Sequence, residues 1–263
     1  MSGVDGAATF HVSGDAYDRF MGRYSRPLAT AFADAAGVEQ GRRALDVGCG
    51  PGALTAELVG RVGPELVAAV DPSPPFVEAC AARHPGVDVR LGRAEELPFD
   101  PGQFDVALSQ LVFHFVGEPE RAAGELCRVV RKGGTVGACV WDLEGRGMRM
   151  LDAFRAAVTA VDPDAPDATV TRRLGREGEL GPLLAAAGAD DVVEGALDVE
   201  VAYTGFDDFW EPFLGGAGPA GAYLASLDDG RRAAIRDELH ALIGSPQGPF
   251  SLPARAWYAV GRA

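Results

Sequence analysis

Short apolar runs alternate with segments of helical periodicity through the first half of the chain. The apolar runs predict strands at Ala44–Val47, Leu66–Val70, Val87–Leu91, Phe104–Ser109 and Thr135–Trp141. The periodic segments predict helices at Pro27–Ala36, with Pro27 in the first turn, at Ala53–Arg61, from an N-cap at Ser73 to Arg83, and at Pro119–Val130. Strands that alternate with helices are typical of an α/β fold, in which helices cover both faces of a parallel sheet.

The pattern loosens after Trp141. Here we expect helices at Met148–Val161, Glu177–Ala187, Phe206–Leu214 and Arg231–Ile243, and strands at Val192–Val201 and Phe250–Arg262. Arg131–Gly134 predicts a helix C-cap followed by a turn, and Gly215–Gly221 predicts a flexible stretch. The sequence has no internal repeat and no clear linker, so we expect one domain over residues 1–263.

The most informative stretch is the apolar run that breaks into glycines, A-L-D-V-G-C-G-P-G-A-L-T at Ala44–Thr55. Gly48, Gly50 and Gly52 let the backbone turn sharply and approach a ligand, because no Cβ intervenes. The spacing G-x-G-x-G differs from the dinucleotide fingerprint G-x-G-x-x-G, and no Lys-Ser/Thr pair follows, as a nucleotide triphosphate loop requires. The alternative interpretation is a structural glycine turn without a ligand.

Polar residues close two further predicted strands. Asp71 lies about 20 residues beyond the glycine loop, where an acid commonly accepts hydrogen bonds from a ribose diol. Its alternative role is only to cap the next helix. Gln110 follows the fourth strand. The carboxyl ends of parallel strands share one edge of a sheet, so we expect these side chains to meet the glycine loop in one crevice.

These residues carry a family resemblance. The string D-V-G-C-G-P-G resembles the first motif of class I S-adenosylmethionine (SAM)-dependent methyltransferases, and F-D-V-A-L-S-Q-L-V-F-H-F-V resembles their fourth. The segment G-R-A-E-E-L-P-F is similar to the family's adenine-side segment, but Arg93 replaces the usual Asp, so only the contacts of Ala94 and Glu95 carry over. The resemblance spans Ala44–Trp141 and is nearest to the ubiquinone/menaquinone-biosynthesis, small-molecule type.

The resemblance implies a Rossmann-like sheet of seven strands, mostly parallel with an antiparallel last strand, flanked by helices and a helical lid. It implies a lid at 1–36, a SAM-binding core at 43–141, substrate-side insertions at 142–187 and 203–248, and a final strand at 250–263. SAM is the implied cofactor and S-adenosylhomocysteine the product. The implied cofactor contacts are Tyr17, Arg23, Asp46, Gly48, Cys49, Gly50, Gly52, Asp71, Pro72, Ala94, Glu95 and Gln110.

Some of these residues have a chemical reason for their role. In the resembling family the N-terminal lid covers the methionine end of the cofactor, where Arg23 can bind the carboxylate in a two-bond geometry and Tyr17 can cover the site. His114 is the candidate general base, since neutral imidazole accepts a proton near pH 7; the alternative is a histidine packed among apolar neighbours. Further aromatic residues can line an acceptor pocket or form the insertions' own core: Trp141, Phe209, Trp210, Phe213 and Tyr223.

Composition and charge limit the partners. The formal net charge of −14 repels phosphate backbones and anionic lipid surfaces, so we expect neither a nucleic acid partner nor membrane insertion. The four cysteines lack C-x-x-C spacing, which favours reduced thiols over a metal site or a disulfide framework. No signal peptide or membrane-length apolar run is visible, so we expect a cytoplasmic protein that is a monomer or a homodimer.

The sequence therefore predicts an enzyme that transfers a methyl group from SAM to an O, N or C atom of a small aromatic or hydrophobic metabolite, in secondary metabolism. A different class shares the same cofactor motifs, namely a SAM-binding protein without methyl transfer, either a cyclase-like enzyme or a regulatory binder. An NAD-dependent oxidoreductase is disfavoured by the glycine spacing. A nucleic-acid methyltransferase is disfavoured by the charge and by S-Q-L-V after the fourth strand.

Overall fold

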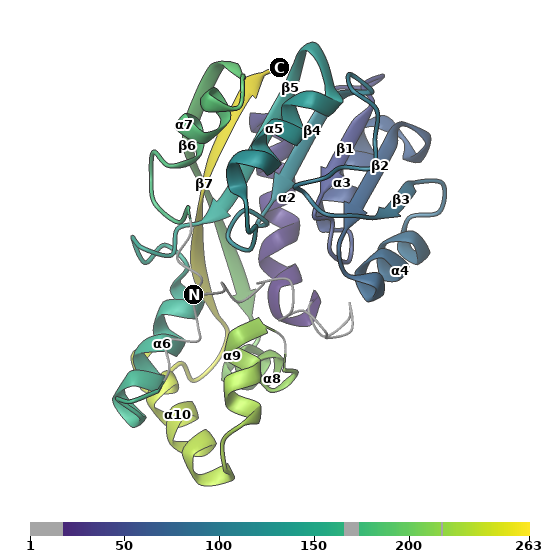
Figure 1. The fold of residues 1–263 in the computed structure, drawn as a ribbon. Helices are drawn as coiled ribbons and strands as arrows, with labels where there is room; N and C mark the ends of the chain where they lie inside the picture. Colours follow the sequence, from purple (N-terminus) through teal and green to yellow (C-terminus); the bar gives the residue numbers. More distant parts are fainter. Residues whose placement is uncertain (1–17, 166–173, 217) are drawn as a thin grey trace.

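Seven strands form one sheet in the computed structural model, which describes residues 18–165, 174–216 and 218–263 (Figure 1). In spatial order the strands are β3 (Asp88–Leu91), β2 (Val67–Asp71), β1 (Ala44–Val47), β4 (Phe104–Gln110), β5 (Val130–Trp141), β7 (Phe250–Arg262) and β6 (Asp190–Tyr203). The first five pair in parallel, whereas β7 runs antiparallel to both of its neighbours. This confirms the predicted fold, a mostly parallel sheet with an antiparallel last strand.

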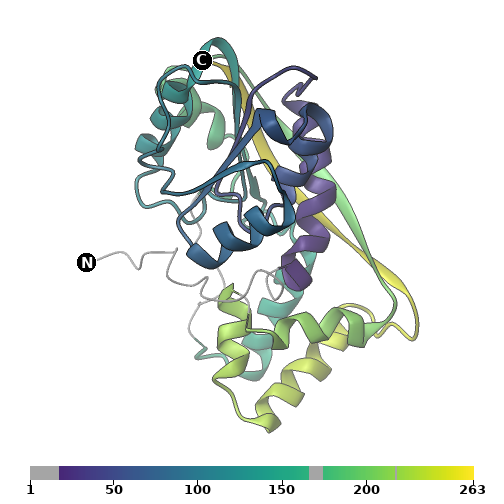
Figure 2. The ribbon, with the colours of Figure 1, turned by 90° about the vertical axis from the view of Figure 1, so that its right-hand side faces the viewer.

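Helices cover both faces of the sheet (Figures 1 and 2). On one face lie α2 (Arg23–Ala35), α3 (Ala53–Val62) and α4 (Pro74–Arg83), and on the other lie α5 (Pro119–Val129) and α7 (Leu180–Ala186). Every residue of β1 and β2 is buried, as expected for strands covered on both sides. The strand order reverses between β1 and β4, and their carboxyl ends therefore flank the point where such sheets bind ligands.

The hairpin of β6 and β7 continues beyond the end of β5. Pairing between β5 and β7 stops at Trp141 and Ala256, but pairing between β6 and β7 runs on to Tyr203 and Phe250. Four helices gather around this extension, and we call them the helical cap: α6 (Arg149–Val161), α8 (Phe206–Leu214), α9 (Gly218–Ala225) and α10 (Asp229–Leu242) (Figures 1 and 2). The cap lies at the carboxyl end of β6, the edge at which ligands bind.

The N-terminal helix is longer than predicted. A π-helical turn at Asp18–Gly22 leads directly into α2, which begins at Arg23, so Pro27 lies inside the helix and not in its first turn. Tyr24, Leu28 and Phe32 bury one continuous stripe on the core. This burial spans the proline and outweighs its helix-breaking tendency. Proline position alone therefore misplaced the start of the helix.

Two glycine-containing segments also differ from expectation. Residues 131–134 belong to β5 and form a bulge opposite Asp105, where the pairing slips between Phe104–Val130 and Val106–Thr135. Gly133 has a φ of +75° there, and its N–H donates to the carbonyl of Ala263 (2.6 Å), so the strand continues where a turn was predicted. The second segment, expected to be flexible, enters α9 at Gly218.

The region after β5 is divided between the two parts of the fold. Its first helix, α6, packs on α10 in the cap, whereas α7 packs on β6, β7 and α5 over the sheet. The helix expected at Glu177–Ala187 begins only at Leu180, and Ser73 stands at the N-cap of α4 without a capping bond from its side chain. Across the described ranges, no helix combines the length and apolarity that crossing a bilayer requires.

Candidate functional site

A crevice opens where the carboxyl ends of β1 and β4 meet the glycine loop between β1 and α3. It consists of two adjoining cavities that share Gly48, Gly50, Gln110 and Leu111. The first is also lined by Asp71, Pro72, Ser73, Phe76, Gly92, Arg93, Ala94, Glu95, Val112, Phe115 and Val116. The second is also lined by Asp18, Gly22, Ser25, Asp46, Cys49, Pro51, Ala53 and Leu54. Nine of the predicted cofactor contacts thus line this crevice, and a tenth, Gly52, lies in the same glycine loop.

The glycine loop owes its shape to three positive φ angles. Gly48, Gly50 and Gly52 have φ of +77°, +52° and +99°, a conformation that side chains disfavour. A Cβ on Gly48 would lie 2.2 Å from Val112, and one on Gly52 would lie 2.6 Å from the His84 ring. A Cβ on Gly50 would meet nothing within 4 Å. Gly48 and Gly52 therefore allow packing, while Gly50 keeps the crevice open to a ligand.

Asp71 lies at the end of β2 and faces the loop. Its Oδ2 accepts the N–H of Gly50 and its Oδ1 accepts the N–H of Ser73, both at 2.9 Å. Burial raises the pKa of Asp71, and the two N–H bonds oppose that rise by stabilising the carboxylate. Each oxygen keeps a second acceptor position, so the carboxylate can receive two hydroxyl donors from a diol.

Two buried acceptors mark the other end of the crevice. Asp46 Oδ2 accepts the Thr55 hydroxyl at 2.6 Å, and Gln110 Nε2 donates to the Ser25 carbonyl at 3.0 Å. Among the described residues, Asp46 Oδ1 and Gln110 Oε1 have no hydrogen-bond partner. Burial raises the pKa of Asp46 to about 7. Unpaired buried acceptors are costly, which indicates that donors of a ligand complete this end of the site.

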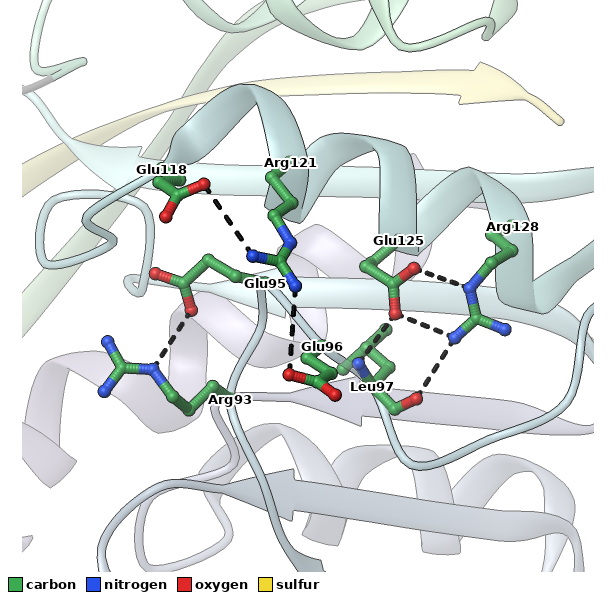
Figure 3. Close-up of polar contacts among 8 residues, drawn as sticks. All are labelled: Arg93, Glu95, Glu96, Leu97, Glu118, Arg121, Glu125 and Arg128. Carbon is green, nitrogen blue, oxygen red and sulfur yellow. Dashed lines mark hydrogen bonds and ion pairs between the residues drawn. The ribbon is translucent and has the colours of Figure 1, made fainter.

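The loop after β3 forms one wall of the crevice, and α5 holds it in place (Figure 3). The N–H of Leu97 donates to Glu125 at 2.7 Å, and Arg128 donates to the Leu97 carbonyl at 3.1 Å. Glu95 accepts the N–H of Gly117 at 3.1 Å, and the Arg93 guanidinium lies 3.7 Å from the second oxygen of Glu95. Arg93 therefore pairs with an acid of its own loop, as Figure 3 shows.

Other predicted site residues lie elsewhere. Tyr17 falls outside the described residues. Arg23 donates through Nη1 to Asp208 Oδ2 on α8 at 2.9 Å, and its second amino group pairs with the other carboxylate oxygen. The same guanidinium lies 5.4 Å from the centre of the Tyr203 ring. In this structure Arg23 connects α2 to the cap.

His114 lies in the loop that follows β4. It is 2% exposed, and its ring packs edge-on to Phe115 at 6.1 Å. Gly175 lies close to the His114 ring, because a Cβ placed on this glycine would be 3.7 Å from His114 Cε1. Its neighbours Val112 and Phe115 line the crevice, so His114 is adjacent to the crevice wall.

The aromatic residues expected to line an acceptor pocket pack against one another or against the core. Phe213 stacks on Phe154 at 4.8 Å and meets Phe20 edge-on at 5.1 Å. Phe209 is 1% exposed, and Trp141 and Trp210 are buried too. Tyr223 is partly buried and donates to Asp162 at 3.2 Å. These residues form the core of the cap and its junction with α2.

Several crevice residues carried no signal in the sequence. Phe76 lies on α4, and its apolar side chain looks like any core position. Asp18 pairs with Arg26 and lines the second cavity, but an acid before a helix is common. Glu125 could have been noticed only as an i, i+3 partner of Arg128, since its contact with Leu97 depends on the fold.

Comparison with known proteins agrees with this geometry. Residues 45–138 match the family model of a methyltransferase domain. An uncharacterized methyltransferase of Mycobacterium tuberculosis is 44% identical over 101 residues, which is 38% of this chain and 40% of that protein. The chain thus matches well under two thirds of the length of that curated relative.

Solved structures share the fold over most of the chain. A protein of Anaeromyxobacter dehalogenans assigned as a type II methyltransferase has a TM-score of 0.62 at 24% identity, covering 90% of this chain and 95% of that one. The [4+2]-cyclase SpnF has a TM-score of 0.58 at 22% identity, covering 90% of this chain and 81% of that one. At these identities the likeness concerns the fold alone.

Proposed function

We propose that this chain is a class I SAM-dependent methyltransferase, which transfers a methyl group from SAM to a small-molecule acceptor. The observation that carries the proposal is the crevice. One wall offers a buried carboxylate with free acceptor positions at Asp71, and the opposite end offers unpaired acceptors at Asp46 and Gln110. An adenosine joined to an amino acid has donors at both ends, so the residues present fit this cofactor.

In this proposal, the residues along the crevice bind different parts of the cofactor. Asp71 binds the ribose hydroxyls, and Ala94 and Glu95 lie beside the adenine. Asp46 and Gln110 accept donors of the methionine portion. When bound, SAM supplies a methyl group that is already activated. The protein therefore contributes mainly by orienting the reactants and by excluding water with apolar wall residues, listed here: Phe76, Leu111, Val112, Phe115 and Val116.

The acceptor is proposed to be a small aromatic or hydrophobic metabolite. The net charge of −14 disfavours a nucleic acid, and the cap stands at the ligand edge of the sheet as a cover for a small molecule. In this proposal residues 43–141 bind the cofactor, and the cap helices within 142–187 and 203–248 select the acceptor. His114, adjacent to the crevice wall, is the proposed general base for an acceptor that starts protonated.

A second candidate is a SAM-binding enzyme that transfers no methyl group. A [4+2]-cyclase shares this fold over 90% of the chain, so the scaffold is compatible with other chemistry. Bond-forming cyclisation would use the same crevice to hold a substrate in a reactive conformation. The two candidates differ in their products, not in their cofactor motifs.

The test is a calorimetric titration of the purified chain with S-adenosylhomocysteine. Asp71→Ala is expected to lower the affinity at least tenfold, because hydrogen bonds to a charged group contribute about 1.5–3 kcal/mol. Asp88→Ala is the matched control, since that carboxylate is exposed on the next strand and pairs with Arg90. Unchanged affinity in Asp71→Ala would overturn the assignment of the ribose site.

A second step separates the two candidates. The wild-type chain is incubated with methyl-labelled SAM and a panel of phenols, quinone precursors and polyketides. Label transfer to an acceptor that requires the intact protein supports methyl transfer. Tight cofactor binding with conversion of an acceptor that gains no label favours the cyclase-like alternative.

A further inference from the structure

Two cysteines meet behind the glycine loop. Cys49 lies in the loop between Gly48 and Gly50, and Cys80 lies on the face of α4 that packs against it. Both are free thiols and both are buried, at 6% and 0% exposed, and they form a small cluster with Ala69 of β2. The two side chains are in contact within this cluster. Cys49 also belongs to the wall of the second cavity of the crevice.

The same face of α4 holds the loop at two further points. Arg83 donates to the Pro51 carbonyl at 3.0 Å, and the His84 ring lies within hydrogen-bond distance of the Gly52 carbonyl at 3.2 Å. Cys80 and Arg83 are three residues apart and lie on one side of α4, and His84 is the C-cap that follows. The position of the loop thus depends on its contacts with α4.

The contact between the two thiols favours the thiolate of Cys80. The neighbouring Cys49 thiol lowers the pKa of Cys80, whereas the Cys80 thiol raises the pKa of Cys49. Cys80 Sγ also lies 3.6 Å from the Thr55 hydroxyl oxygen. Neither of the other two cysteines has such a neighbour: burial alone raises the pKa of Cys127, and burial is the main cause of the raised pKa of Cys139. A thiolate beside a second thiol is the arrangement in which an oxidised sulfur is readily resolved into a disulfide.

We propose that Cys49 and Cys80 are a redox modification site, at which a small peroxide entering through the crevice converts the two thiols into a disulfide. One thiolate attacks the peroxide and becomes a sulfenic acid, with release of one water molecule when the oxidant is hydrogen peroxide. The second sulfur then attacks the sulfenic sulfur, the disulfide bond forms, and a second water leaves. In sum, the two thiols lose two hydrogens and two electrons, and the peroxide gains them.

The bond would act on the cofactor site through the loop backbone. A disulfide of about 2.05 Å is much shorter than a contact between non-bonded sulfurs, so it draws Cys49 toward α4. The next residue, Gly50, donates its N–H to Asp71 and leaves room for the ligand. Displacement of this residue weakens cofactor binding. Conversely, a ligand in the crevice covers Cys49 and slows its oxidation, a step that rests on the proposed function.

The test uses the full, reduced chain treated with graded hydrogen peroxide and then alkylated in denaturant. Mass spectrometry is expected to find a peptide pair linked through Cys49 and Cys80, with a mass loss of about 2 Da from the two hydrogens removed. Titration with S-adenosylhomocysteine is expected to show an affinity at least tenfold lower, which recovers after dithiothreitol. Saturating S-adenosylhomocysteine during the peroxide treatment is expected to slow formation of the link at least fivefold.

Matched variants test whether the loss of affinity after peroxide treatment depends on Cys49 and Cys80. Cys80→Ser is expected to form no link and to keep its affinity after peroxide and dithiothreitol, with circular dichroism confirming the fold. A Cys127→Ser/Cys139→Ser variant is expected to behave as the wild type. Both thiols remaining alkylatable after peroxide would overturn the proposal, as would a link that leaves the affinity unchanged. If the reduced chain binds no cofactor, the proposed function fails, while the mass measurement still decides whether the disulfide forms.

Discussion

Gly48 and Gly50 are two residues apart and both have positive φ, but their surroundings differ. The space beside Gly48 is filled by Val112, whereas the space above Gly50 is open. The motif identifies both positions equally, because glycine spacing records the backbone turn. Only the packing shows that one glycine allows contact between protein segments and the other allows contact with a ligand.

Alanine substitutions should separate these two roles. Either change adds about 1–2 kcal/mol of backbone strain, but Gly48→Ala also forces Val112 to move and should lower the Tm by several degrees more. Gly50→Ala should lose at least tenfold in affinity for S-adenosylhomocysteine, because its methyl group enters the crevice. Thermal unfolding and calorimetry of both variants check this. Wild-type affinity in Gly50→Ala would show that the ligand does not approach this glycine.

Asp46 has a stability consequence that follows from its burial. The pKa of this carboxyl is raised to about 7 in the folded chain, above the value near 3.9 of an unfolded chain. Folding therefore favours its protonated form, and stability falls as the pH rises from about 4 to 7 and then stays level. Above pH 7 the ionised Asp46 lowers the free energy of unfolding by about 2–4 kcal/mol, since each unit of pKa difference corresponds to about 1.4 kcal/mol.

Asp46→Asn removes this titration and keeps an acceptor for the Thr55 hydroxyl. The variant should match the wild type near pH 4 and exceed its Tm by several degrees above pH 7, measured by thermal unfolding of the cofactor-free chain at each pH. Asp71→Asn is a poorer comparison, because two N–H bonds already stabilise that carboxylate. If the Tm difference between Asp46→Asn and the wild type does not change with pH, the titration of Asp46 does not explain it.

At the scale of elements, the apolar runs predicted the strands of the parallel core to within a residue or two, except that β5 begins at Val130 and not at Thr135. The strands β1 and β2 are buried on both faces, so their composition alone identifies them. The misplaced elements depend on distant contacts. Pro27 is tolerated because α2 buries a long stripe, and residues 131–134 stay in β5 because Gly133 bonds to Ala263. No local pattern carries such information.

The contact of α5 with the loop after β3 gives a prediction at this scale. Glu125→Ala leaves the Leu97 N–H without its acceptor and removes the carboxylate partner of Arg128, so the wall that carries Ala94 and Glu95 loosens (Figure 3). We expect a threefold to tenfold loss of affinity for S-adenosylhomocysteine, equivalent to about 0.7–1.4 kcal/mol. Calorimetry measures the loss directly.

The matched control for that substitution is Glu120→Ala. Glu120 is exposed in the first turn of the same helix and lies away from the loop contacts of Glu125. Its removal should leave the affinity within about twofold, near the reproducibility of such a titration. Equal losses in the two variants would attribute the effect to α5 as a whole and would refute a specific role for Glu125.

At the scale of the whole molecule, the cap and the end of β6 are joined to the N-terminal helix by contacts that the sequence could not predict. Arg23 and Asp208 are 185 positions apart, and Tyr24 and Tyr203, whose hydroxyls lie 2.7 Å apart, are 179 apart. The family resemblance assigned Arg23 to the cofactor, a role that remains a proposal. In this structure the guanidinium of Arg23 is hydrogen-bonded to the Asp208 carboxylate.

Asp208→Asn tests how much this junction stabilises the chain. The Arg23 hydrogen bond lowers the pKa of Asp208 to about 2, so its stabilising effect is full above about pH 4 and is lost as the pH falls through 2. Because Arg23 is partly exposed, we expect about 1 kcal/mol at most, or a Tm lower by about 2–4 °C at pH 7. Thermal unfolding should show this difference narrowing below pH 4.

Asp207→Asn is the control, since Asp207 also lies in the first turn of α8 but pairs with Arg236 inside the cap. The loss of one exposed pair there should change the Tm by about 1 °C or less. A drop as large as that of Asp208→Asn would mean that charge near the start of the helix matters more than the junction with α2.

The ends of the long connection between β6 and β7 are direct neighbours, because Tyr203 pairs with Phe250. Everything between them, including α8, α9 and α10, is therefore a single excursion from one hairpin. A segment of a different length can be joined at these two positions, because the pairing of Tyr203 with Phe250 already fixes where the excursion starts and ends. If the cap selects the acceptor, as proposed above, one recombination event that exchanges this segment would change the acceptor and leave the strands that carry the crevice in place.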